Sequence, residues 1–379
     1  MPGPAMTIAD HDVGLPTGID EVTPDWLTSV LRSSGVLGTD ESVATVETEP
    51  FAVGVGLLSQ LHRAHLSYGD GVEGPTTLIV KFPIDIPHQR AIADAFNVYG
   101  REVKAYREIA SHSPILTPTV HAAIHDAEAS HCCIVMEDLT GHTQVDTEAG
   151  ASWEQACAAI DALAAFHARW HEHPDLGELA ETFFDHGDPM FLGALPPVYE
   201  AGWPRTKELA ADLLTDEVIA FGDRWAEHLP TMLQRSSTPK TILHNDWRSD
   251  NMFHADDGTP IVFDFQITGV GNGAFDLAYY LSQSLERATI RGRRPDLVHR
   301  YVERLATHGI ERDAEAVLDD VRVITAFCIM YGFASFPEYE ALPDEGKAMT
   351  RQLLRRCVEA IEDLDALAAI ERAAPSAGH

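Results

Sequence analysis

The hydrophobic pattern changes its period once along the chain, and this change constrains the fold more than any other feature. From Val43 to about Asp138, short apolar runs rich in β-branched residues alternate with turn residues, and one charged helical stretch, Gln89 to Ile109, interrupts them. After Gly141 most segments repeat with the helical period. The pattern predicts an α+β chain with a strand-rich part followed by a helical part.

We place the boundary near Leu139 to Gly141. The predicted organisation is a small β-rich N-terminal lobe over residues 1–139, a larger and mainly helical C-terminal lobe over residues 140–372, and a disordered tail over residues 373–379. Helices of the second lobe are expected over Trp153 to His173, Lys207 to Leu229, Phe275 to Leu285, Pro295 to His308, Ala314 to Phe333 and Glu345 to Glu371.

Two short apolar runs interrupt the helical lobe. TILH begins at Thr241 and PIVFDF begins at Pro260, and turn-forming residues occupy Ala255 to Thr259 between them. We expect both runs to be strands that flank this turn. That arrangement would bring Asp246 and Asp264 near one hairpin.

Composition narrows the possible partners and the compartment. A formal net charge of −32 repels polyanions, which speaks against nucleic acid or an anionic membrane surface as a partner. No apolar run approaches the length that crosses a bilayer, and the first residues lack the basic start and apolar stretch of a secretion signal. The five cysteines show no metal-binding spacing. We therefore expect a cytoplasmic protein with cysteines in its core.

The segment HNDWRSDN carries the strongest chemical signal. Asp246 follows an apolar run, where a carboxylate can accept the proton of a substrate hydroxyl. Asn251, five residues later, and Asp264, at the end of the next apolar run, supply the hard oxygen atoms that Mg²⁺ prefers. One carboxylate beside an attacking hydroxyl and two ligands for a nucleotide-bound metal are what phosphoryl transfer requires. The spacing predicts a kinase.

The residues next to Asp246 in the sequence have simpler interpretations. Arg248 is a candidate for offsetting charge on the transferred phosphoryl group, and an ion pair with Asp250 or Asp257 is an equally good interpretation. Trp247 is expected to pack in the core. His244 is expected to hold the loop through hydrogen bonds and not to carry a proton.

A lysine inside an apolar strand requires a partner. Lys81 lies in TLIVKFP, and a buried ammonium group is costly unless a carboxylate pairs with it. Glu102, in the following helix, is the first candidate, while Glu108 and a solvated lysine at the strand end are the alternatives. A lysine paired in this way would hold its head against nucleotide phosphates.

Two further segments complete the candidate nucleotide site. Gly54 and Gly56 lie between strand-like runs, where a backbone hairpin can close over phosphates; an ordinary turn is the alternative. The run HCCIVMEDLTG passes from a strand into a bend, so the backbone at Glu137 and Leu139 is a candidate for the adenine edge, with a plain loop as the alternative.

These residues together resemble the aminoglycoside phosphotransferase and choline kinase-like superfamily, which has the bilobal protein-kinase-like fold. The stretch from FDFQ to AFDLAYYL is most similar to the ecdysteroid kinase-like branch. The resemblance implies ATP and Mg²⁺ as cofactors. It implies a phosphate loop from Gly54 to Ser59, a phosphate-binding Lys81 with its helix partner Glu102, a catalytic base at Asp246, and metal ligands at Asn251 and Asp264. It also implies that the helix with His167 packs beneath the catalytic loop and that Asp276 anchors this loop.

The sequence departs from the family pattern at two places. Asn245 stands where a glycine or arginine usually precedes the catalytic aspartate, and Phe265 and Gln266 follow Asp264 in place of the usual pairs. These departures leave the chemistry intact and weaken the case for one antibiotic substrate. Only ten residues separate Asp264 from Phe275, which is too short for a peptide-docking segment. A small hydroxyl acceptor is therefore expected.

The acceptor itself is left open by these patterns. Aminoglycosides, amino sugars, choline-like amines and other alcohols all fit, as do ATP and GTP, and no residue pattern indicates an oligomeric state. The segment around Trp203 and the stretch Tyr331 to Glu340 are candidates for acceptor contacts, with core packing as the alternative.

Three other functions were weighed. A catalytically inactive, nucleotide-binding pseudokinase scaffold is the main alternative, although every charged residue of the reaction is present. The run GVGNGA, from Gly269 to Ala274, meets a loose dinucleotide fingerprint but lacks the surrounding βαβ alternation. His167 and His171 form an HxxxH pair without the glutamate that a zinc hydrolase needs.

Overall fold

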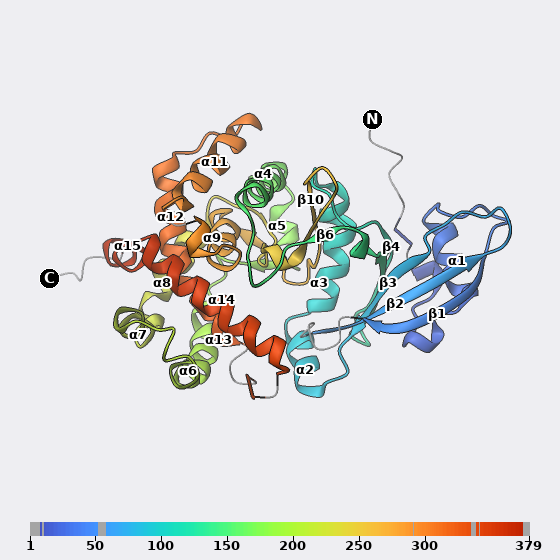
Figure 1. Cartoon of the computed structure of the whole chain (residues 1–379), viewed down its shortest axis with the longest axis horizontal. Coiled ribbons are helices and arrows are strands. Elements are labelled where there is room, and N and C mark those ends of the chain that lie inside the picture. The colour runs from blue at the N-terminus through green and yellow to red at the C-terminus, as the bar shows by residue number, and fades with distance from the viewer. Residues whose placement is uncertain are drawn as a thin grey trace. The chain divides into compact units, whose positions relative to one another are not determined.

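The computed structural model describes residues 8–9, 11–51, 58–290, 292–334, 339–340 and 342–373 (Figure 1). Contacts divide the chain into two compact units. The N-terminal unit comprises residues 1–113, 117–142 and 263–266, and the C-terminal unit comprises residues 114–116, 143–262 and 267–379. Apart from Ala373, which ends the last helix, the tail predicted to be disordered lies outside the described residues.

The N-terminal unit is built on a five-stranded antiparallel sheet with the order β1-β2-β3-β5-β4. The strands are β1 (Val43–Phe51), β2 (Ser59–Tyr68), β3 (Thr77–Pro83), β4 (Val120–Asp126) and β5 (His131–Glu137). All five coincide with runs that the sequence pattern predicted. Neighbouring strands pair in sequence order except for the last two, because β5 inserts between β3 and β4.

One face of this sheet packs on α1 (Pro24–Ser33), a helix that the sequence analysis did not place (Figure 1). Thr23 caps its N-terminus by accepting the Trp26 N–H, and Pro24 occupies the first turn, where a missing N–H costs nothing. The helix buries Leu27 and Val30 in one core with alternate residues of the sheet, Val80 among them. Since side chains alternate along a strand, Lys81 points to the opposite face.

That opposite face carries the helical stretch predicted for residues 89–109, which is divided into three pieces. These are α2 (Pro87–Ala95), α3 (Val98–Lys104) and a π-helical turn, η3 (Ala105–Ile109), which is followed by the 3₁₀ turn η4 (Ala110–His112). Helix α3 packs on β4 and β5. A π-helical turn is rare and often marks a functional site.

The C-terminal unit is mainly helical, as predicted. In it α4 packs on α11, α12 packs on α9 and α15, and α14 packs on α9. The helices are α4 (Trp153–Trp170), α5 (Leu176–Leu179), α6 (Phe191–Leu209), α7 (Asp216–Gly222), α8 (Trp225–Ser237), α9 (Ala274–Gln283), α10 (Arg287–Ile290), α11 (Arg294–Thr307), α12 (Ala314–Phe327), α13 (Ile329–Ala334), α14 (Asp344–Asp363) and α15 (Ala366–Ala373).

Three predicted helices are each divided in the structure, and one helix was not predicted. The helix expected from Ala314 to Phe333 is α12 followed by α13, and the helix expected from Glu345 to Glu371 is α14 followed by α15. Helix α6 was missed because Pro196, Pro197 and Pro204 lie inside it, and proline is usually a sign that a helix ends. The single helix predicted from Lys207 to Leu229 is instead the end of α6, then α7, then the start of α8. Thr215 starts α7 as a new helix by accepting the Val218 N–H.

Two small sheets interrupt the helices of this unit. One has the order β10-β9-β6 and the other β7-β11-β8. Their strands are β6 (Thr143–Gln144), β7 (Phe184–Asp185), β8 (Thr241–Leu243), β9 (Met252–His254), β10 (Pro260–Val262) and β11 (Gly269–Gly271).

The expected partnership of TILH with PIVFDF is wrong. Strand β10 pairs with β9, whereas β8 pairs with β11 in the other sheet. The physical reason is local, because a tight turn at residues 255–259 joins the segments directly on either side of it, and MFH precedes the turn.

No helix within the described residues is both long and apolar enough to cross a membrane.

The free energy of unfolding of the N-terminal unit is expected to fall as the pH drops below 6.5, the ordinary pKa of a histidine side chain. Burial lowers the pKa of His121 from 6.5 to about 4. Between these values the unfolded chain binds a proton that the folded chain does not, so stability is complete above pH 6.5 and is lost as the pH falls. At pH 5 the loss amounts to about 2 kcal/mol, and His121→Gln should remove it. Urea unfolding of both proteins at pH 7 and pH 5 checks this, and equal pH responses would contradict it.

Candidate functional site

Lys81 lies at the centre of a buried charge cluster in the N-terminal unit. Its side chain comes from β3, is 7% exposed, and places Nζ 2.6 Å from Glu102 Oε1 of α3. The same Nζ lies 3.0 Å from Asp264 Oδ1. The ion pair expected between Lys81 and Glu102 is therefore present, while Glu108 instead lies 3.7 Å from Lys104. A third group, Asp264, completes the cluster.

The cluster holds two carboxylates and one cation away from water. Burial alone would lower the pKa of Lys81, but the charges of Asp264 and Glu102 outweigh it and raise this pKa above its ordinary value. Burial raises the pKa of Glu102 above its ordinary value against the lowering effect of Lys81, and the charge of Asp264 acts in the same direction as burial. The ammonium group is thus held in its charged form.

The loop from His244 to Asn251 in the C-terminal unit is held by one buried carboxylate. Asp276, at the start of α9, is fully buried and accepts the backbone N–H of His244 at 2.7 Å and of Asn245 at 2.8 Å. Its Oδ2 also lies 3.1 Å from Nε2 of His167, whose Nδ1 contacts the Tyr301 hydroxyl at 2.8 Å. The anchoring of the loop by Asp276 and the packing of the His167 helix beneath it both match the arrangement that the resemblance implied.

Asp246 is surrounded by donors. Nδ2 of Asn251 donates to the carbonyl oxygen of Asp246 at 3.0 Å and to its Oδ2 at 2.7 Å. Nε of Arg248 lies 3.1 Å from Oδ1, and the buried Tyr279 of α9 interacts with the same carboxyl group. Three side chains from the loop and from α9 thus surround the carboxylate of Asp246, a residue that is 9% exposed.

The remaining loop residues lie as follows. Arg248 pairs with Asp250 at 3.6 Å as well as with Asp246. Trp247 is fully buried and stacks on Phe166, so it packs in the core as expected. His244 accepts the Asp246 N–H through Nδ1, in keeping with its expected role in holding the loop.

The phosphate loop predicted at Gly54 and Gly56 lies outside the described residues. Ser59, at the start of β2, is described. Its hydroxyl is buried, and no described residue forms a hydrogen bond with it. A buried hydroxyl without a partner is unusual, because its desolvation is then not compensated.

The proposed adenine contacts have partners within the protein. The backbone N–H of Glu137 donates to the Thr119 carbonyl at 2.8 Å, and the Glu137 carboxylate accepts the Thr119 N–H at 3.0 Å. The carbonyl of Leu139 accepts the His142 N–H at 2.8 Å. The backbone atoms in these bonds are already used by the protein itself.

The alternative motifs have structural explanations. Gly269 to Gly271 form β11, which is parallel to β7 and antiparallel to β8, and this small sheet is not a βαβ unit. A Cβ at Gly273 would lie 2.5 Å from the Tyr301 hydroxyl and 2.6 Å from His167 Nδ1, so the glycine is required by packing. Among the described residues, no three of the His, Cys, Asp and Glu side chains gather as metal ligands would.

The candidate acceptor residues are partly accounted for. Trp203 is 4% exposed and stacks on Tyr199, and a Cβ at Gly222 would lie 2.2 Å from its ring, so Trp203 belongs to the core. Tyr331 contacts Tyr279 with ring centroids 4.9 Å apart. Residues 335–338 of the predicted stretch lie outside the described part of the chain.

The sequence analysis missed two polar residues of these constellations. Tyr279 was overlooked in AFDLAYYL, although it follows Asp276 by three residues and so lies close to it on the helix. Tyr106 was overlooked beside Phe265, although it follows Glu102 by four residues and so lies on the same side of the helix. Helical spacing from an already identified acid was the available signal in both cases.

The fold, the charge cluster around Lys81 and the group of side chains around Asp246 together define the class of protein. A five-stranded antiparallel sheet carrying a strand lysine paired with a helix glutamate, together with a helical unit carrying an Asp-x₄-Asn loop, is the protein-kinase-like fold. Within that class, the model of the ecdysteroid kinase-like family matches residues 54–311, and the chain belongs to this family. No curated protein gave a significant match.

Solved structures with the same fold are distant in sequence. The choline kinase of Cryptosporidium parvum is 9% identical, with a TM-score of 0.53 over 86% of this chain and 91% of that chain. The ethanolamine kinase of Plasmodium vivax is 12% identical, with a TM-score of 0.51 over 84% of each chain. A spectinomycin phosphotransferase, solved with ADP and spectinomycin, is 11% identical, with a TM-score of 0.50 over 91% of this chain and 99% of that chain. At these identities the likeness establishes the fold.

Asp276→Asn is expected to lower the free energy of unfolding of the C-terminal unit by about 3 kcal/mol, because one buried acceptor oxygen becomes an NH₂ group that faces another donor. Urea unfolding measures the loss. Asp313→Asn is the matched control. Asp313 caps α12 from an exposed position, and asparagine caps a helix as well as aspartate does. An equal effect of the two substitutions would contradict the anchoring role of Asp276.

Proposed function

We propose that the protein is a small-molecule kinase that transfers the γ-phosphate of ATP to a hydroxyl group of a small acceptor. The observation that carries the proposal is the setting of Asp246, a nearly buried carboxylate held by Asn251 from one side and Arg248 from the other. Membership of the ecdysteroid kinase-like family supports the same reaction. In this reaction Asp246 accepts the proton of the acceptor hydroxyl as that oxygen attacks the phosphoryl group.

The buried cluster of the N-terminal unit supports a nucleotide site. Lys81 is held in its charged form by Glu102, so its ammonium group is available as a fixed positive charge for phosphate oxygens. The buried hydroxyl of Ser59, with which no described residue forms a hydrogen bond, fits a phosphate contact, since a bound oxygen would satisfy it. Gly54 and Gly56 complete the proposed phosphate loop. For the adenine edge we propose the backbone at Glu137 and Leu139, through atoms other than the Glu137 N–H and the Leu139 carbonyl, which bond Thr119 and His142.

Asn251 and Asp264 are the proposed Mg²⁺ ligands, and their donor atoms suit a hard cation. Since Nδ2 of Asn251 donates to Asp246, the amide oxygen is the atom turned away from that carboxylate. The carboxylate of Asp264 is 23% exposed while its Oδ1 contacts Lys81. When bound, the metal neutralises phosphate charge. Arg248 is also proposed to neutralise charge on the transferred phosphoryl group. Its pairing with Asp246 and Asp250 keeps it beside the reacting groups.

The proposal also specifies ATP as the nucleotide, the cytoplasm as the location and a small alcohol as the acceptor. Only ten residues separate Asp264 from Phe275, so the chain has no long docking segment there for a peptide. Small alcohols are therefore favoured as acceptors, with aminoglycosides, amino sugars and choline-like amines among them.

Asp246→Asn is expected to abolish turnover and to leave nucleotide affinity largely unchanged, because the amide cannot accept the hydroxyl proton. A screen for release of the nucleoside diphosphate across small alcohols, with ATP and GTP in parallel, identifies the acceptor, and this variant provides the background. Asp257→Asn, in the exposed turn after β9, is the matched control and should retain full activity. Full activity of Asp246→Asn would contradict the assignment, and Mg·ATP binding without ADP release from any acceptor would favour a pseudokinase scaffold.

Asp264→Ala is expected to weaken nucleotide binding only when Mg²⁺ is present. The substitution removes a proposed metal ligand, whereas Lys81 keeps its contact with Glu102. Titration calorimetry with a non-hydrolysable ATP analogue, with and without Mg²⁺, separates the two contributions. The same loss of affinity under both conditions would argue against a metal-binding role.

A further inference from the structure

Tyr106 connects the helix that carries Glu102 with Asp264, which contacts Lys81 and is a proposed metal ligand. It lies in η3, four residues after Glu102, and is 1% exposed. The Asp264 backbone N–H donates to its hydroxyl oxygen at 3.1 Å. Its ring meets that of Phe265 edge to face, with centroids 5.4 Å apart. All of these residues belong to the N-terminal unit.

The backbone that Tyr106 contacts is strained. Asp264 has φ = 68°, in the left-handed region, which costs a residue with a side chain on the order of 1 kcal/mol and persists only where surrounding contacts impose it. Two contacts do so at this position. Lys81 holds the carboxylate at 3.0 Å, and Tyr106 holds the backbone N–H at 3.1 Å. The carboxylate therefore has a defined direction before any ligand binds.

The local helix geometry places Tyr106 for this contact. The helix changes from α to π at Ala105, one residue before Tyr106. A π-helical turn lowers helix stability, and such turns persist frequently at functional sites.

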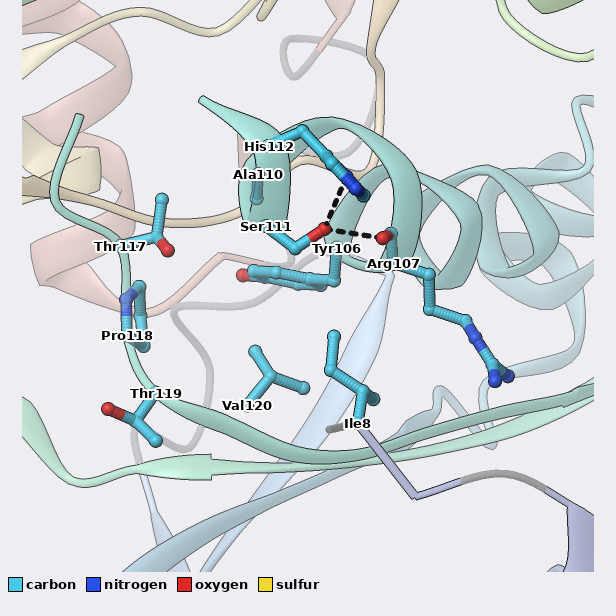
Figure 2. Close-up of a pocket in the computed structure, with 10 residues that line it drawn as sticks. All are labelled: Ile8, Tyr106, Arg107, Ala110, Ser111, His112, Thr117, Pro118, Thr119 and Val120. Atoms are coloured by element: carbon cyan, nitrogen blue, oxygen red, sulfur yellow. Dashed lines mark hydrogen bonds between the residues drawn. The ribbon is translucent and has the colours of Figure 1, made fainter. Parts of the chain in front are cut away.

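Tyr106 also lines a pocket of the same unit. The cavity measures about 490 Å³, and its lining includes Ala110 of η4, Thr117 of the segment before β4, and Val120, the first residue of β4 (Figure 2). Tyr106 itself is 1% exposed, so its ring is packed, and the hydroxyl contact with Asp264 is the interaction that a change to phenylalanine removes.

We infer that Tyr106 is a positioning residue of the phosphotransfer site: its hydroxyl fixes the left-handed backbone at Asp264 and so presents the Asp264 carboxylate to the nucleotide-bound Mg²⁺. The inference rests on the proposed function. It assigns Tyr106 no contact with the substrate and no proton transfer.

Tyr106→Phe tests the inference, because it removes the hydroxyl and keeps the ring that contacts Phe265. We expect the affinity for a non-hydrolysable ATP analogue without Mg²⁺ to be unchanged and the gain in affinity on adding Mg²⁺ to fall about fivefold, the equivalent of one hydrogen bond. Titration calorimetry of the full chain measures both. Tyr68→Phe is the matched control, since it removes a hydroxyl that donates to the Pro75 carbonyl at 2.8 Å elsewhere in the same unit. It should leave the Mg²⁺-dependent gain intact.

Hydrogen exchange provides a readout that does not depend on a ligand. The peptide containing Asp264 should exchange faster in Tyr106→Phe than in the wild type, while peptides from β3 and β5 should not change. Faster exchange throughout the N-terminal unit would mean that Tyr106 only supports the fold, and this would overturn the inference.

The binding results separate the inference from the function on which it rests. A wild-type Mg²⁺-dependent gain in Tyr106→Phe, with that gain lost in Asp264→Ala, overturns the role of Tyr106 and leaves the proposed function standing. A gain retained in both variants overturns the metal-binding role of Asp264 and the inference with it.

Discussion

A single ammonium group inside the N-terminal sheet sets the main constraint on this protein. Lys81 comes from the middle strand, and its neighbour Val80 belongs to the core on the other face. An isolated charge at such a position would cost several kcal/mol of desolvation, so the fold is stable only if carboxylates meet it. Glu102 and Asp264 do so, and they come from positions far apart in the chain. The requirement to pair one charge thus ties a strand, a helix and the segment 263–266 into one unit.

The C-terminal unit also buries a charged group, in this case the negative carboxylate of Asp276. Among the described residues, no ion pair joins this carboxylate to a lysine or arginine. Two backbone N–H groups and a histidine surround its oxygens. A carboxylate that accepts several such bonds is well compensated, and it fixes the donors in return. The loop that carries Asp246 therefore owes its shape to a residue thirty positions further along the chain. This explains how a polar loop with a left-handed residue, Asn245, is held in one conformation.

Much of the arrangement could be predicted from the sequence because it follows from local rules. The strands follow from short apolar runs rich in β-branched residues and bounded by turn residues, and the Lys81–Glu102 pair follows from the cost of an unpaired buried lysine. The segments that were wrong involve competing signals. Three prolines masked α6, and the turn at residues 255–259 joined β10 to β9 and not to β8. Helix α1 was not predicted, although Thr23 and Pro24 are typical signals of a helix start.

The sequence by itself determined which chemical groups the protein carries and roughly on which elements they lie, since side-chain type and hydrophobic period are local properties. Only the tertiary structure decided which of them meet. The hydroxyl of Tyr106 reaches the backbone of Asp264 across 158 positions, and Tyr279 reaches Asp246 from a helix that begins after two small sheets. Such contacts depend on the path of the whole backbone, which packing of the entire core selects. The spacing of residues along one element does not specify that path. A hydrogen bond also requires a particular direction between donor and acceptor, and the folded backbone sets this direction.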